Sequence, residues 1–162
     1  MRHAKSDWNA NAGRDFERPL NTRGNRDAKN MGRWLKAGGY IPDMIISSPA
    51  VRAKETITRV CHELGINEQR IVWDRRIYEA RLEELLEVIN THADGARCML
   101  MVGHNPGLDM LVSYLARDEL PLSASGKLMT TAAIAVLDYG KSPVTTIRAA
   151  ASQAIIARPK EI

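Results

Sequence analysis

Short continuous apolar runs alternate along the chain with segments in which apolar residues recur every three or four positions. The continuous runs predict buried strands, at residues 44–46, 71–73 and 99–102. The segments with helical spacing predict helices, at residues 22–37, 48–64, 82–89 and 108–115. Strands that alternate with helices are typical of α/β domains. The sequence therefore predicts a three-layer sandwich, with helices on both faces of a mainly parallel sheet.

Residues with strong positional preferences mark where two of these helices begin and end. Thr22 is expected to cap the first helix, which continues to the glycine pair at 38–39. Ser48 and Pro49 favour the start of the second helix, with the serine as its cap and the proline in its first turn. Gly65 is the expected cap at the carboxyl end of that helix.

The two ends of the chain carry weaker patterns. The first twenty residues are polar and predict a loop. Residues 131–137 and 144–150 predict two further strands, joined by a turn at Tyr139 and Gly140. Because no repeat, low-complexity tract or flexible linker divides the sequence, residues 1–162 are expected to form a single domain.

Charge and cysteine content narrow the class of protein. The formal net charge is +4, and acidic and basic residues are mixed along the chain, which suits an anionic substrate but is equally typical of an ordinary basic soluble protein. Basic residues are not interleaved with aromatic ones, so nucleic acid is not an expected partner. No apolar run approaches the roughly 20 residues of a membrane-spanning helix, so no membrane partner is expected. Cys61 and Cys98 form no CxxC pair, and we expect reduced cysteines in a cytoplasmic protein.

Four short stretches contain residues suited to phosphate chemistry. In chain order they are Arg2-His3, Ser48-Pro49-Ala50-Val51-Arg52, Tyr78-Glu79 and Gly103-His104. Taken alone, each stretch has an ordinary explanation. The first is a solvated terminus, the second a helix cap with an exposed arginine, the third a surface carboxylate and the fourth a polar turn. Only their combination points to a site.

Two of the stretches have features that an anionic ligand would explain. Arg52 places a cation in the first turn of a predicted helix, where the helix dipole disfavours it. An anion bound at that helix start would remove the conflict. His104 directly follows the strongest predicted strand, and sites in α/β sheets gather at the carboxyl ends of strands. The neighbouring Asn105 is a candidate for binding the same phosphate, or alternatively for a hydrogen bond within its own loop.

In combination, the order Arg-His, Ser-Pro-x-x-Arg, glutamate and Gly-His resembles the histidine phosphatase superfamily over nearly the whole chain. Further similarity to the SixA-like phosphohistidine phosphatase branch lies at residues 5–8, 18–24, 103–108 and 129–134. The resemblance implies a phosphoglycerate-mutase-like fold. It also implies hydrolysis of a phosphoryl group through a phosphohistidine intermediate.

The resemblance assigns a role to each candidate residue. His3 would attack phosphorus as a neutral imidazole, which splits one difficult displacement into two easier ones. Arg2, Arg52 and His104 would surround the phosphoryl group, with two guanidinium groups and an imidazolium matching its charge. Glu79 would be the general acid for the leaving group and then the base for the attacking water.

No metal or other cofactor is expected for this chemistry. The sequence contains no HExxH motif, no clustered cysteines and histidines, and no GxxxxGK[ST] loop. His62 and His92 fall in predicted helices and are expected to be structural or exposed.

The sequence departs from the family pattern at its start. In the family a buried strand precedes the Arg-His pair, whereas here the pair occupies positions 2 and 3, so the first strand is apparently truncated. On this interpretation Met1 is an internal methionine of a longer natural chain. The activity that the resemblance implies would then depend on the missing strand.

Three functions remain open from the sequence. The first is a phosphatase that acts on phosphohistidine in a protein partner, favoured because the chain has no large insertion to form a lid over a small ligand. The second is a phosphomonoesterase with the same site that acts on a small phosphorylated metabolite. The third is a catalytically silent phosphate-binding module, which the missing strand supports and the retained histidines and arginines oppose.

Overall fold

The three predicted strands form a parallel sheet at the centre of the molecule. The computed structural model describes all of residues 1–162. Strand β1 (Met44–Ser47) lies between β2 (Ile71–Trp73) and β3 (Met99–Val102), and both neighbours run parallel to it. All three strands therefore end at the same edge, where parallel sheets place their sites.

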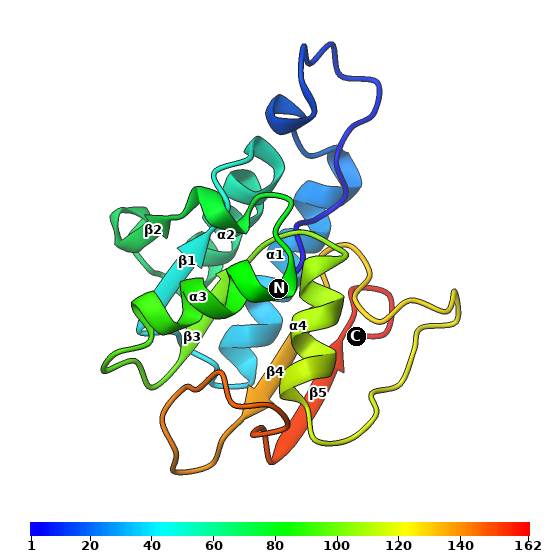
Figure 1. The fold of residues 1–162 in the computed structure, drawn as a ribbon. Helices are drawn as coiled ribbons and strands as arrows, with labels where there is room; N and C mark the ends of the chain where they lie inside the picture. The colour runs from blue at the N-terminus through cyan, green and yellow to red at the C-terminus, as the bar shows by residue number, and fades with distance from the viewer.

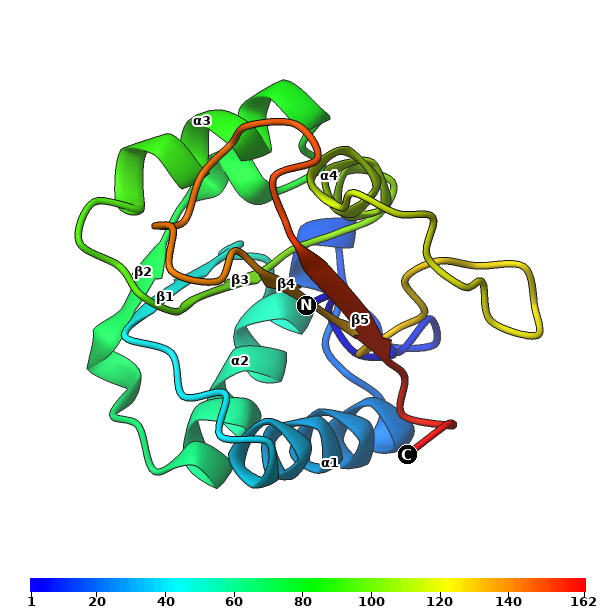
Figure 2. The same cartoon turned by 90° about the horizontal axis from the view of Figure 1, so that it is seen from below.

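Two pairs of helices cover the two faces of this sheet. The helices are α1 (Thr22–Ala37), α2 (Val51–Leu64), α3 (Leu82–His92) and α4 (Gly107–Leu115). Ile45 and Leu100 pack with α1 and α2, while their strand neighbours Ile46 and Met101 pack with α3 and α4. Successive side chains of a strand point to opposite faces, so each strand contributes to both cores. Figures 1 and 2 show the three layers, which confirm the predicted α/β sandwich.

A separate antiparallel pair lies beside the open edge of β3. Strand β4 (Ile134–Asp138) confirms most of the strand predicted at 131–137. Its partner is β5 (Gln153–Ala157), so the strand predicted at 144–150 is wrong. Backbone N–H groups at the end of that segment instead donate to α4: Ala149 bonds Tyr114 at 2.9 Å, and Ala151 bonds Leu115 at 3.1 Å.

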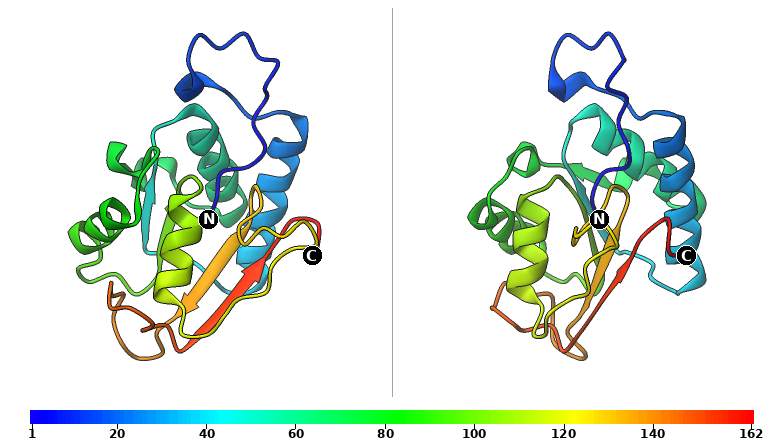
Figure 3. Two further views of the ribbon diagram at one scale, coloured as in Figure 1. Left: turned by 45° about the vertical axis from the view of Figure 1, so that its right-hand side comes forward. Right: turned by 90° about the vertical axis from the view of Figure 1, so that its right-hand side faces the viewer.

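Residues 1–3 lie in the space between β3 and β4. The His3 N–H donates to the Gly103 carbonyl, and the Gly103 N–H donates to the Met1 carbonyl. On the other side the Arg2 N–H donates to the carbonyl of Ala133. The segment is thus hydrogen-bonded like the end of a central strand. Figures 1 and 3 place this terminus inside the molecule rather than on its rim.

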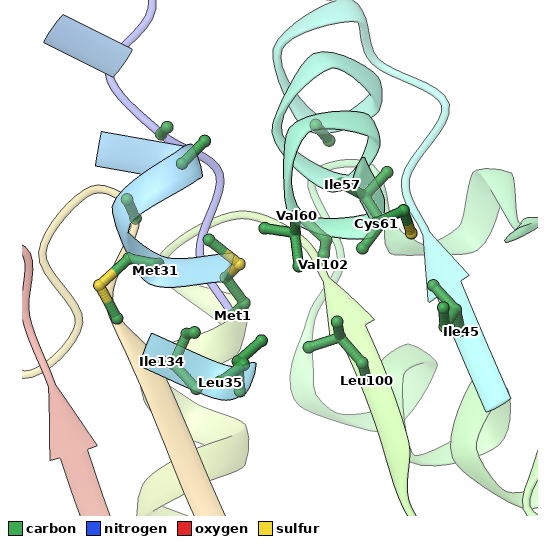
Figure 4. Packing of buried hydrophobic residues seen from close by; sticks show 14 of the residues in the cluster. Met1, Met31, Leu35, Ile45, Ile57, Val60, Cys61, Leu100, Val102 and Ile134 are labelled. Carbon is green, nitrogen blue, oxygen red and sulfur yellow. The ribbon is translucent and has the colours of Figure 1, made fainter. Parts of the chain in front are cut away.

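The rest of the space between the two sheets is an apolar cavity. Its volume is about 220 Å³, and its walls include Met1, Leu100 and Met101 on one side and Ala135 and Leu137 of β4 on the other. Figure 4 shows Met1 together with Leu35 and Ile134, apart from Leu100 and Val102 on β3. The facing edges of β3 and β4 therefore border a slot, and residues 1–3 lie at one end of it.

Two helix starts differ from the predictions. The cap of α1 is Asn21, whose side-chain oxygen accepts the Gly24 N–H at 2.8 Å, rather than Thr22. Helix α2 begins at Val51, with Ala50 as its cap, rather than at Ser48 and Pro49. The Ser48 hydroxyl lies within hydrogen-bond distance of the His104 ring, as described below. None of the helices is both long and apolar enough to cross a membrane.

Candidate active site

Three of the predicted residues come together at the carboxyl edge of the sheet. His3 ends the terminal segment of residues 1–3. Arg52 lies in the first turn of α2, and His104 comes two residues after β3. The imidazole rings of His3 and His104 have centroids 5.0 Å apart, and Arg52 Nε lies 3.3 Å from His3 Nε2. Their exposed fractions are 8, 5 and 6 % for His3, Arg52 and His104. Residues from three distant parts of the sequence thus form one buried cluster.

The protonation state of His3 follows from its neighbours. His3 Nδ1 lies 2.7 Å from the Ala4 carbonyl oxygen, which only accepts, so we assign the proton to Nδ1. Nε2 then carries the lone pair and accepts from Arg52 Nε. The pKa of His3 is lowered to about 4, first by burial and then by the positive charges of nearby arginines. At neutral pH His3 is therefore an uncharged imidazole with Nε2 available as a nucleophile.

His104 is also neutral in this state, and the imidazolium expected from the resemblance concerns the state with a phosphoryl group bound. Its Nε2 lies 2.8 Å from the Ser48 hydroxyl, and its Nδ1 is buried without a hydrogen-bond partner. Burial, then repulsion from His3 in its protonated form and from Arg52, lowers the pKa of His104 to about 3. A phosphoryl dianion bound between the rings would oppose these effects, since an opposite charge favours the protonated form.

Arg52 is held by a residue that the sequence did not single out. Its two terminal nitrogens donate to the Asp15 carbonyl at 2.7 Å and the Asp15 carboxylate at 2.8 Å. The Tyr78 hydroxyl donates to that carboxylate at 3.0 Å, and Arg18 pairs with it at 2.6 Å. Burial raises the pKa of Asp15, but Arg52, Tyr78 and Arg18 together lower it below its ordinary value. Asp15 is therefore an anion, and it occupies the guanidinium nitrogens of Arg52 that were predicted to bind phosphate.

Little in the sequence could have identified Asp15. It lies three residues before the Arg18-Pro19-Leu20 match, inside a polar loop whose charges follow no pattern. Thr56 was missed for a similar reason, because it lies on the inner face of α2. Its hydroxyl accepts the Ala4 N–H at 2.9 Å and donates to the Arg52 carbonyl at 2.6 Å. This contact joins the strand end that carries His3 to the helix that carries Arg52.

Arg2 and Asn105 both bond one loop carbonyl. An Arg2 terminal nitrogen donates to the Met129 oxygen at 2.8 Å, and the Asn105 amide donates to the same oxygen at 3.1 Å. Asn105 thus makes the loop hydrogen bond that was its alternative interpretation. Arg2 Nε and Asn105 Oδ1 are buried without partners. Buried polar atoms of this kind are uncommon, and the free Arg2 N–H is a donor suited to an anion.

Glu79 is near the cluster but not bonded to it. It has left-handed backbone geometry, with φ of 54°, directly before α3. Its carboxylate makes no hydrogen bond or ion pair with the histidines or with Arg52. Its neighbour Tyr78 packs edge-on against the His104 ring, with centroids 5.3 Å apart. No group of three or more histidine, cysteine or acidic side chains is arranged to hold a metal ion.

Acid is expected to destabilise the fold through the two buried histidines. Their folded pKa values, about 4 and about 3, lie below the ordinary 6.5, so below pH 6.5 the unfolded chain binds more protons. At pH 5 each histidine then lowers the free energy of unfolding by about 2 kcal/mol. Thermal unfolding midpoints followed by circular dichroism should fall between pH 7 and pH 5.

Two variants control this prediction. His104→Asn removes one titrating group and should show a smaller fall in melting temperature. His62→Asn removes a side chain that is 81% exposed and should behave like the parent chain. The same pH dependence in both variants would contradict the assignment.

Asp15→Asn is expected to tighten the binding of phosphate or tungstate about two- to fivefold. The Asp15 side chain is 44% exposed, so its ion pair with Arg52 contributes about 0.2–1 kcal/mol, which an entering anion must replace. Titration calorimetry with each oxyanion gives the dissociation constants. Glu17→Gln, in the same exposed turn, is the matched control. Weaker oxyanion binding in Asp15→Asn would mean that Asp15 positions Arg52 instead of competing with the anion.

Comparison with known proteins agrees with this geometry. The family profile of the histidine phosphatase superfamily (branch 1) matches residues 1–80. Phosphohistidine phosphatase SixA of Escherichia coli K12 is 28% identical over 149 residues, covering 88% of this chain and 84% of SixA.

Two solved structures extend the comparison. A SixA-type protein of Agrobacterium tumefaciens is 33% identical with a TM-score of 0.61, over 69% of this chain and 73% of that one. A protein histidine phosphatase SixA complexed with tungstate has a TM-score of 0.76 at 21% identity, over 99% and 96% of the chains, and supports the fold. With an Arg-His pair, an arginine and a second histidine meeting at one sheet edge, this chain belongs to the histidine phosphatase superfamily and to its SixA-like branch.

Proposed function

We propose that this protein hydrolyses phosphohistidine in a protein partner by passing the phosphoryl group to His3. The observation that supports this most is the state of His3, a neutral imidazole with its proton on Nδ1 and its Nε2 lone pair facing Arg52. The substrate class follows the SixA relatives, whose name states that activity. The absence of a large insertion over the site is consistent with a protein substrate.

The proposed reaction has two displacements. In the first, the His3 Nε2 lone pair forms a bond to phosphorus while the bond to the partner's imidazole nitrogen breaks, and Glu79 supplies the proton that the leaving group takes up. In the second, water attacks phosphorus as the bond to Nε2 breaks, and its proton returns to Glu79. Inorganic phosphate leaves, and both side chains regain their starting states.

The charge of the transferring group is matched by residues around His3. Arg52 and Arg2 donate N–H groups to the phosphoryl oxygens, and His104 gains a proton or donates a hydrogen bond once the dianion is bound. Arg52 must exchange its contacts with Asp15 for contacts with substrate. Asn105 keeps the loop that supports Arg2 in place, through the shared Met129 carbonyl.

Trapping of the covalent intermediate tests this proposal. The chain is mixed with phosphohistidine-labelled protein and quenched rapidly without acid, because phosphohistidine is acid-labile. Label on His3 is expected; label on a serine or aspartate would refute the mechanism. A parallel panel of phosphoproteins, phosphorylated metabolites and a chromogenic phosphate ester separates the alternatives. A preference for a metabolite would change the proposed substrate from a phosphoprotein to a small molecule. No turnover of any compound would indicate a phosphate-binding module.

Arg52→Ala is expected to lower kcat roughly a hundred- to a thousandfold, with a smaller change in KM. The guanidinium meets the greatest charge on the phosphoryl group in the transition state, so its loss affects turnover most. Arg52→Lys should recover little, since an ammonium cannot make paired hydrogen bonds. Steady-state kinetics with the chromogenic ester measures both values. Full activity of the lysine variant would show that Arg52 serves only the structure of α2.

A further inference from the structure

A second hollow, distinct from the cluster of His3, Arg52 and His104, borders the site on the side of Arg2. This basic groove has a volume of about 510 Å³, far more than one phosphoryl group needs. Its walls come from the terminal segment, from α1, from the loop between α4 and β4, and from the residues after β5. The charged and hydroxyl residues that line it are Arg2, Lys5, Arg23, Asp27, Ser123, Ser125, Lys127, Thr130, Thr131, Arg158, Lys160 and Glu161.

Positive charge is concentrated in the basic groove. Six of its lining residues are cationic and only two are acidic. This excess of four charges equals the formal net charge of the whole chain, +4, so the remainder of the protein is formally neutral. A local excess of one sign attracts partners of the opposite sign and orients their approach.

Only part of this charge is neutralised within the protein. Arg158 pairs with Glu161 at 2.9 Å, and Arg23 lies 3.7 Å from Asp27. Lys5, Lys127 and Lys160 form no ion pair. These three ammonium groups come from three separate segments of the chain, which the fold brings to one surface.

The wall of the basic groove is held firmly by Arg158. This side chain is 4% exposed, and its guanidinium donates to the carbonyls of Leu128, at 3.1 and 3.2 Å, and of Pro121. These bonds tie the loop between α4 and β4 to the end of β5. Lys127 and Lys160, on the two joined segments, are exposed. The wall of the basic groove is therefore fixed by hydrogen bonds, and two lysines that form no ion pair lie exposed at its edge.

We infer that the basic groove binds an acidic segment of the phosphorylated protein partner, next to the phosphorylated residue. Arg2 lines the groove, and its charge is close enough to His3 to lower the pKa of that histidine, so the groove lies beside the site. The hydroxyls of its serines and threonines add donors for carboxylates. No lining residue is aromatic, and single-stranded nucleic acid is held largely by stacking on aromatic side chains. An acidic peptide therefore fits better than RNA or DNA.

A binding measurement that needs no turnover tests this inference. The probes are a fluorescein-labelled ten-residue glutamate-rich peptide, the same peptide with glutamines, and a single-stranded thymidine ten-mer. Fluorescence anisotropy should show binding of the acidic peptide that weakens with salt. The double variant Lys127→Ala/Lys160→Ala should bind it about five- to tenfold more weakly, as expected for two exposed charge contacts of about 0.5–0.7 kcal/mol each.

The control is Lys36→Ala/Lys141→Ala, which removes two exposed lysines outside the groove and should bind like the parent chain. Equal affinity of the two double variants, or no preference for glutamate over glutamine, would overturn the inference. Tighter binding of the thymidine ten-mer, lost in Lys127→Ala/Lys160→Ala, would assign the groove to nucleic acid instead.

The role of the bound segment as substrate rests on the proposed function, and kinetics separates the two claims. In Lys127→Ala/Lys160→Ala, KM for a phosphohistidine peptide flanked by glutamates should rise about five- to tenfold. The kcat and KM for a chromogenic phosphate ester should stay unchanged, because neither lysine belongs to the cluster around His3. A chain that binds the acidic peptide but turns over no phosphate compound would refute the proposed function and leave the groove's assignment standing.

Discussion

His3→Ala is expected to reduce turnover by roughly 10⁴-fold or more while leaving the fold intact. The covalent route requires a bond between Nε2 and phosphorus, and alanine offers no group that can form it. The fold should survive because the main chain of residues 1–3, rather than the imidazole, is hydrogen-bonded to Gly103 and Ala133. Steady-state assay with a chromogenic ester and a thermal unfolding curve measure the two effects.

The control for this prediction is His62→Ala, since His62 is largely exposed on α2 and distant from the cluster. It should retain full turnover. Substantial activity in His3→Ala would mean that another group receives the phosphoryl, or that water attacks the substrate directly. A collapse of the unfolding midpoint in His3→Ala would instead mean that the imidazole is needed for packing.

An extension of six apolar residues ahead of Met1 is expected to raise the free energy of unfolding by roughly 2–4 kcal/mol at pH 7. The added residues would enter the cavity of about 220 Å³ and offer backbone partners to the facing edges of β3 and β4. Ordering each added residue costs about 1–2 kcal/mol, which offsets much of the gain from burial. Turnover should also rise, because Arg2 and His3 would then follow a complete strand.

Part of this gain comes from moving the α-amino group. The amino group of Met1 is buried, donates to the Met101 carbonyl at 2.7 Å, and has its pKa lowered to about 5 by burial. Because the unfolded chain holds this proton up to about pH 8, burial of the amine costs about 1 kcal/mol at pH 7 and about 4 kcal/mol at pH 5. The stabilising effect of the extension should therefore be larger at pH 5.

A second extension of six glycine and serine residues separates the two contributions. It displaces the buried amine but brings no side chains that fill the cavity, so it should recover only the part that depends on pH. Unfolding midpoints and turnover at pH 5 and pH 7 are compared for the three chains. If both extensions leave stability and turnover unchanged, the slot between β3 and β4 is not a strand position.

The site combines two kinds of residue, which differ in how readily the amino-acid sequence alone identifies them. Arg2, His3, Arg52 and His104 belong to short motifs, and three of the four, His3, Arg52 and His104, lie in one buried cluster. Asp15 and Thr56 act through contacts that join distant segments, and no local pattern distinguishes them from ordinary polar residues. The role of Glu79 stays a prediction, because its carboxylate makes no contact that would establish it.

Local patterns were sufficient where one segment's own side chains decide its structure. The apolar runs at 44–46, 71–73 and 99–102 became the strands of the parallel sheet, because short continuous apolar runs are typical of strands in a sheet covered on both faces. Helix periodicity and the left-handed Gly65 cap were readable for the same reason. The motif order was likewise enough to identify the family, because the motif residues lie directly after strand ends and at a helix start.

Tertiary structure decided the features in which two distant segments compete for the same partner. Residues 144–150 carry apolar side chains, yet the edge of β4 is taken by 153–157 while the carbonyls at the end of α4 hold the loop between them. The charge states of His3 and His104 depend on burial and on arginines brought from elsewhere in the chain. The basic groove is assembled from four separate segments, and the counter-ion of Arg52 from a loop 37 residues away. Such effects arise only when folding removes water and brings charges within a few ångströms, so no window of sequence contains them.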